Sequence, residues 1–67
     1  MTTIEGTVER ITYRNEDNFY TVFKFKVGTD DIYTCVGNLA QITAGEELRL
    51  TGEWVRHNVY GLQFSVE

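Results

Sequence analysis

The segment FKFKV, residues 23 to 27, alternates large apolar side chains with lysines. This alternation is typical of a β-strand that has one face in a core and the other in water. Four further runs are rich in β-branched and aromatic residues, and the chain contains no proline, which favours strands joined by short turns. We therefore predict strands over residues 4–13, 19–27, 32–37, 48–55 and 60–66.

The first run contains a change of phase. Ile4, Gly6 and Val8 share one parity, whereas Ile11 and Tyr13 share the other. A one-residue bulge near residues 9–10 would return Ile11 and Tyr13 to the inward face and would bend the strand sharply. We predict such a bulge.

The connections are short. Residues 14–18 (RNEDN) favour a loop, and residues 28–31 (GTDD) favour a tight hairpin. Residues 38–45 (NLAQITAG) are predicted to form a turn or a single helical turn. These features predict one all-β domain over residues 1–67, a small five-stranded Greek-key barrel of the OB-fold type. An SH3-like barrel is the alternative.

The last two runs carry an aromatic-rich hairpin, WVRHNVYGLQF, over residues 54–64. Trp54 shares its parity with other apolar residues of its run, and Tyr60, Leu62 and Phe64 share theirs. We expect these four side chains to close the barrel. The alternatives are a stacking platform at Trp54 and a ligand contact at Tyr60.

The composition excludes several classes of protein. With Cys35 as its single cysteine, the 67-residue chain can form neither an internal disulfide nor a thiolate zinc site, and a lone thiol is typical of the cytoplasm. The amino terminus does not resemble a signal peptide, and no apolar run is long enough to cross a bilayer, so no membrane contact is expected.

Enzymatic signatures are also lacking. The sequence has no phosphate-binding loop, and neither Ser65 nor Cys35 has a recognisable histidine partner. His57 and scattered carboxylates do not predict a metal site. We expect no catalytic residue, metal or cofactor in this chain.

The charge balance argues against strong, non-specific nucleic-acid binding. Six Lys and Arg residues face ten Asp and Glu residues, for a net charge of -4. Six of the acids fall in three adjacent pairs beside predicted turns, at residues 16–17, 30–31 and 46–47. A weak local basic face is therefore compatible with the sequence, although Glu16 and Asp17 would repel phosphate.

A candidate binding surface follows from the predicted fold. OB-folds bind single strands and oligosaccharides across their second and third strands, between the loops that here span residues 14–18 and 56–59. Aromatic rings there can stack on bases while cations follow phosphates. The candidate contacts are Arg14, Tyr20, Lys24, Lys26, Tyr33, Arg56, His57 and Tyr60.

Some of these candidates also have a plain structural interpretation. Lys24 and Lys26 fit any solvated strand face, and His57 fits an exposed loop. Neither interpretation requires a ligand.

Three stretches together resemble a known family. They are GTVERITYRNEDNFYTVFKFKV from Gly6, VGNLAQITAGEELRLTGEWV from Val36, and YGLQF from Tyr60. In this order and at these spacings they resemble the amino-terminal domain of the long RecD-like (YrrC-type) ATP-dependent DNA helicases, which are similar to the exodeoxyribonuclease V alpha subunit. Leu62 departs from the basic residue expected in many relatives, which lowers the expectation of a phosphate contact in the hairpin.

The resemblance implies an accessory OB-fold domain excised from the amino terminus of a larger helicase that acts in DNA repair or replication. ATP and Mg would serve the motor domains of that parent, whose motifs are absent here. The expected partners are the other domains of the helicase and, weakly, single-stranded DNA. A protein-interaction module without DNA affinity and an autonomous single-strand-binding domain remain the alternatives.

Overall fold

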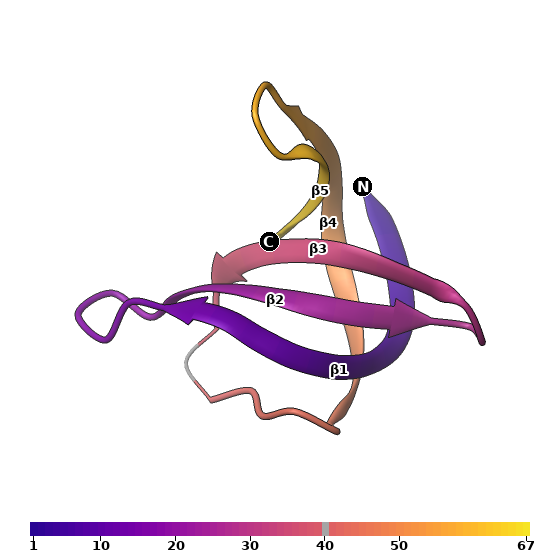
Figure 1. The fold of residues 1–67 in the computed structure, drawn as a ribbon, viewed down its shortest axis with the longest axis horizontal. Helices are drawn as coiled ribbons and strands as arrows, with labels where there is room; N and C mark the ends of the chain where they lie inside the picture. The colour runs from indigo at the N-terminus through magenta and orange to yellow at the C-terminus, as the bar shows by residue number, and fades with distance from the viewer. Residues whose placement is uncertain (40) are drawn as a thin grey trace.

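The computed structural model describes residues 1–39 and 41–67 as a closed barrel of five strands (Figure 1). They are β1 (Thr2–Arg14), β2 (Tyr20–Val27), β3 (Asp31–Asn38), β4 (Glu47–His57) and β5 (Gly61–Val66). The strands follow the order β1-β2-β3-β5-β4, and β4 returns to β1. Only the β3–β5 pair is parallel among these described strands. The predicted five-stranded barrel of the OB-fold type is confirmed.

β1 closes the barrel because it pairs with two strands. Residues 2–7 pair with β4, and pairing with β2 begins at Thr7. Gly6 lies at this crossover, where a Cβ atom would overlap the carbonyl oxygen of Lys26. The absence of a side chain therefore lets β1 pass close enough to β2 to change partners.

β1 contains two register shifts. The shift between Val8 and Arg10 confirms the predicted bulge, and a second shift, between Ile11 and Tyr13, was not predicted. Because a one-residue slip exchanges the two faces of a strand, Tyr13 points outward and is 52% exposed. The expectation that Tyr13 faces inward is wrong. Arg14 takes the inward phase, in register with the buried Thr21.

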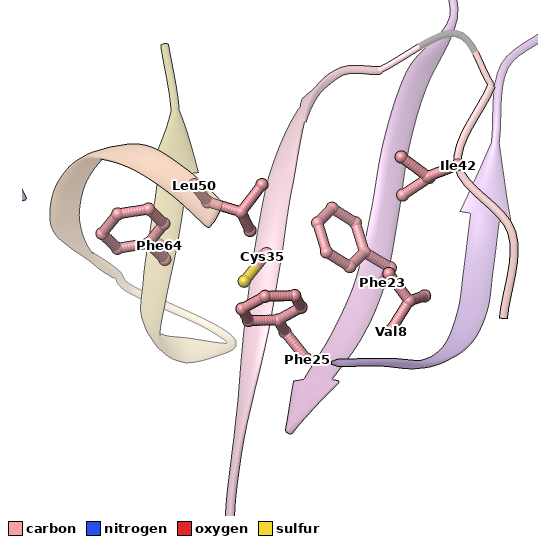
Figure 2. Close-up of a cluster of buried hydrophobic side chains, with 7 residues drawn as sticks. All are labelled: Val8, Phe23, Phe25, Cys35, Ile42, Leu50 and Phe64. Carbon is pink, nitrogen blue, oxygen red and sulfur yellow. The ribbon is translucent and has the colours of Figure 1, made fainter. Parts of the chain in front are cut away.

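The core is small and largely aromatic. Phe23 and Phe25 of β2 are fully buried and meet edge to face, with ring centroids 6.0 Å apart. Figure 2 shows the buried cluster, which comprises Val8, Phe23, Phe25, Cys35, Ile42, Leu50 and Phe64.

Ile42 reaches this core from the segment between β3 and β4, and its side chain lies beside Phe23 (Figure 2). Asn38 ends β3, and the described residues of segment 38–45 form turns without a helical turn.

 Ala40 lies outside the described residues, so at that position the prediction of a turn stays a prediction.

The β4–β5 hairpin extends beyond the barrel and stands away from β2 and β3 (Figure 1). Trp54 is 36% exposed, and its ring packs edge-on against Tyr33 and Phe64 at centroid distances of 5.0 and 4.9 Å. Phe64 is fully buried as expected, but Leu62 is 46% and Tyr60 is 74% exposed. The expectation that Leu62 and Tyr60 close the barrel is wrong.

The reason lies in the pairing of the neighbouring strands. β1 accompanies β4 only as far as the pair of Thr2 with Gly52, and β3 accompanies β5 only along residues 63–65. Beyond these points the hairpin has no further strand partner among the described residues. Strand parity therefore no longer distinguishes a buried face from an exposed one.

Gly52→Ala is predicted to remove a large part of the stability of the protein. A Cβ at this position would overlap the carbonyl oxygen of Ser65, and overpacking costs about 1–3 kcal/mol or more. A core of this size supplies only about 3–5 kcal/mol. Urea denaturation measures the loss in the free energy of unfolding.

Gly28→Ala is the control. Gly28 has a φ of 71°, but no atom lies within 4 Å of its added Cβ, so the cost is about 1 kcal/mol of backbone strain. Equal losses in the two variants would contradict the role of close backbone approach at Gly52.

Cys35 gives a second prediction. Burial raises the pKa of its thiol from 9.0 to about 12. As the pH rises above 9.0, the unfolded chain releases this proton while the folded chain keeps it, so folding becomes less favourable. From this group alone, the free energy of unfolding should fall between pH 9 and 12, with a slope that approaches about 1.4 kcal/mol per pH unit midway between these values.

Cys35→Ala removes this dependence and leaves every other titrating group in place. The stability difference between the wild type and Cys35→Ala should therefore shift by about 1 kcal/mol from pH 9 to pH 10, in favour of the variant. Parallel pH profiles of the two proteins, measured by urea denaturation, would contradict the prediction.

Candidate nucleic-acid interface

A groove of about 510 Å³ crosses the outer face of β2 and β3, between the β1–β2 loop and the tip of the β4–β5 hairpin. It is lined by Thr12, Tyr13, Tyr20, Val22, Lys24, Thr34, Val36, His57, Tyr60 and Gln63.

The floor of the groove is apolar. Val22 of β2 and Val36 of β3 lie opposite each other in register. Val36 is only 8% exposed, although its neighbours in sequence, Cys35 and Gly37, hold the inward phase. The walls carry tyrosines, and an apolar floor between aromatic walls suits a flat, unsaturated ring better than it suits a fully hydrated ion.

The β1–β2 loop is fixed by its own asparagines. The Asn15 side-chain oxygen accepts the N–H of Asp17 at 2.8 Å, and that of Asn18 accepts the N–H of Tyr20 at 3.0 Å. The Asn38 side chain donates to the Asn18 carbonyl at 2.9 Å, which ties the loop to β3. These hydrogen bonds fix the position of Tyr20 at the start of β2. Tyr20 is 38% exposed and lines the groove.

The loop also holds Phe19 at a φ of 60°, in the left-handed region that non-glycine residues seldom adopt. The Phe19 carbonyl accepts hydrogen bonds from the Leu39 N–H at 3.1 Å and from the Thr21 hydroxyl at 3.0 Å. These bonds maintain the unusual conformation and connect the loop to the start of β2.

His57 shapes the tip of the hairpin. Its Nδ1 accepts the backbone N–H groups of Val59 at 3.0 Å and Tyr60 at 3.2 Å. Its ring lies 4.9 Å from the Tyr60 ring at an interplanar angle of 36°. The tip thus presents two neighbouring rings, tilted relative to each other, at the edge of the groove, and Nδ1 serves as an acceptor rather than a donor.

The polar groups of the groove are few. Lys24 donates from Nζ to the Thr34 hydroxyl at 2.7 Å, and Gln63 is in register with Thr34 on the neighbouring strand. Among the described residues that line the groove, only Lys24 and His57 can carry a positive charge. The arrangement can therefore stack aromatic rings and offer a few hydrogen bonds, but it attracts polyanions only weakly.

Four of the eight candidate residues from the sequence come together in this groove: Tyr20, Lys24, His57 and Tyr60. Lys26 instead lines a second, more open depression of about 620 Å³, with Glu5 and Arg49 among its neighbours. These two neighbours form an exposed ion pair of 2.6 Å.

The other three candidates lie elsewhere. Tyr33 packs against Trp54. Arg56 is in register with Leu62 and, being next to His57 in a strand, points to the opposite face of the hairpin. Arg14 donates from Nη2 to the Ile42 carbonyl at 2.6 Å and is half-buried.

Sequence reasoning missed several residues of the groove. Tyr13 was assigned to the inward face because the second bulge of β1 leaves no mark in the apolar pattern. The outward phase of β3 could have identified Thr34 and Val36, and that of β5 could have identified Gln63, since each follows from strand alternation alone.

Two further findings concern other kinds of site. Within residues 1–39 and 41–67, no three His, Cys, Asp or Glu side chains gather as metal ligands. The same described residues include no helix long and apolar enough to span a membrane.

Arg14→Met is predicted to lower the free energy of unfolding by about 1.5–3 kcal/mol, because it leaves the buried Ile42 carbonyl without a charged donor. Arg10→Met is the matched control, since Arg10 is exposed on the same strand, and it should change stability by less than about 0.5 kcal/mol. Thermal and urea denaturation measure both. Equal effects would contradict a structural role for Arg14.

The barrel agrees with a comparison against known families. The model of the OB-fold domain of the ATP-dependent DNA helicase YrrC matches residues 1–67. No solved structure matches the chain. The match covers the whole chain, and the strand order and closure are those of a five-stranded barrel. The chain therefore belongs to the family of OB-fold domains of YrrC-type ATP-dependent DNA helicases.

Proposed function

We propose that this chain is a non-catalytic accessory domain of a RecD-like helicase, and that its groove holds a short stretch of single-stranded DNA weakly. The observation that carries the proposal is the gathering of Tyr13, Tyr20 and Tyr60 with Lys24 around one groove. The three rings supply stacking surfaces, and the lysine supplies one phosphate contact.

The proposed mode of binding relies on stacking. Base–aromatic stacking contributes about 1–3 kcal/mol per base and tolerates any base. One phosphate contact gives a slope of log K against log salt of only about -0.7 on a single strand. A net charge of -4 opposes any larger electrostatic contribution. The domain would therefore guide a strand that the motor already holds, rather than capture one from solution.

The rest of the proposed role comes from the family. The domain packs against the motor domains of a cytoplasmic helicase that acts in DNA repair or replication. ATP and Mg belong to those motor domains, and the residues of this chain contribute no chemical step.

The test is a titration of fluorescently labelled oligothymidine with the chain, at low and at near-physiological salt. Tyr20→Ala and Tyr60→Ala should each weaken binding by about fivefold to a hundredfold. Lys24→Met should weaken binding modestly and should flatten the salt dependence by about 0.7 in slope.

Lys26→Met is the matched control, because Lys26 shares the strand and the outward phase of Lys24 but lines the other depression. It should leave both affinity and salt slope unchanged. Absence of binding at low salt, or equal effects of the two lysine variants, would overturn the groove as a DNA site.

A protein-interaction module is the second candidate function. It is favoured by Val55 and Val59 of the hairpin, which are 47% and 74% exposed. In that case the titration detects no DNA binding, and a helicase that contains Val59→Ser loses a protein partner without losing DNA affinity.

A further inference from the structure

The outer part of β4 has an unpaired edge. β1 follows β4 only to the pair of Thr2 with Gly52, whereas β4 continues to His57. Along residues 53–57 its only strand partner among the described residues is β5, on the other side. Open edges of this kind are sites where another strand can add.

The direction of the backbone groups on this edge follows from one hydrogen bond. The Glu67 N–H donates to the Thr51 carbonyl at 2.9 Å, so odd-numbered residues of β4 direct their backbone groups toward β5. The even-numbered Trp54 and Arg56 therefore direct their N–H and C=O groups toward the open edge.

The sequence of this edge, EWVRH, complements itself in the antiparallel direction. If two copies pair about a two-fold axis at Val55, Trp54 of one copy lies opposite Arg56 of the other, and their backbone groups exchange hydrogen bonds. Glu53 lies opposite His57, and Val55 lies opposite its own symmetry mate. A guanidinium beside an indole and a carboxylate beside an imidazole are both favourable cross-strand pairs.

Two other pairings of such edges are less favourable. Parallel pairing in register would set Glu53 against Glu53 and Arg56 against Arg56, and like charges directly opposite each other are destabilising. A one-residue shift of the antiparallel register would set the hydrogen-bonding residues of one strand against non-bonding residues of the other.

We propose that two copies of this chain associate through the open edge of β4, in antiparallel register about Val55. The two hairpins form a four-stranded sheet with two-fold symmetry, and each copy contributes the same surface. The contact covers Val55, which is 47% exposed in one copy, and part of Trp54, which is 36% exposed. It also supports a two-stranded ribbon that would be only marginally stable in water by itself.

Sedimentation equilibrium over a wide range of chain concentration is the first test. The average mass should rise from 7.7 kDa toward twice that value. Val55→Lys places two ammonium groups face to face on the two-fold axis, and it should weaken the dimer about tenfold or more. Because Val55 is half exposed in one copy, this variant should keep the wild-type melting temperature at concentrations where the wild type is monomeric. A monomer at every concentration, or a dimer insensitive to Val55→Lys, would overturn the proposal.

Disulfide trapping tests the register. Residues on the axis form a non-hydrogen-bonded pair, whose side chains lie close enough for a disulfide. Val55→Cys should therefore give a cross-linked dimer rapidly under mild oxidation. Val59→Cys is the matched control: Val59 is more exposed, at 74%, but lies away from the axis. The native Cys35 is buried and does not compete.

Equal rates of cross-linking for the two cysteine variants would indicate random collision and would overturn the proposed register.

A second test of the register exchanges charges between the two strands. Glu53→Lys alone should weaken the dimer, and Glu53→Lys with His57→Glu should restore it, because a lysine and a glutamate of opposite charge then face each other.

Discussion

The barrel depends on the double pairing of β1. One strand contacts β4 along its first half and β2 along its second, and the exchange occurs where Gly6 lets the backbone approach Lys26 closely. Without this crossover the remaining strands would form an open sheet, and Phe23, Phe25 and Phe64 would lack the enclosing layer that buries them. In a chain of 67 residues with no disulfide, closure of the barrel must provide the burial of apolar surface that a larger core provides in larger proteins.

The bulges of β1 connect this closure to the groove. Each bulge adds curvature to the strand, and the second also exchanges the roles of two adjacent side chains. Tyr13 becomes a wall of the groove, while Arg14 turns inward to hold the segment that carries Ile42 into the core. The same local irregularity thus stabilises the fold and places an aromatic ring where a base could stack.

The sequence predicts most of the fold because strand alternation is a local property. The apolar phase of β2, the first bulge of β1 and the strand boundaries to within a few residues all follow from it. Two features do not follow. The bulge between Ile11 and Tyr13 does not show in the apolar pattern, because a tyrosine can lie on either the buried or the exposed face of a strand. The exposure of Leu62 depends on where β1 and β3 end beside the hairpin. Half of the candidate site residues line the groove. Strand alternation predicts which face of a strand a residue lies on, but it does not predict how far a surface built from several strands extends.

The hairpin belongs to both proposed surfaces, and this has a thermodynamic consequence. His57 and Tyr60 form one wall of the groove, while residues 53–57 form the open edge. A two-stranded ribbon beyond the barrel retains conformational freedom that either contact must restrict. Once pairing of two edges has ordered the ribbon, a nucleic acid that stacks on Tyr60 meets a smaller entropic cost. By reciprocity, the bound strand favours association to the same degree. The two surfaces are therefore coupled through one element, without any rearrangement of the barrel that carries them.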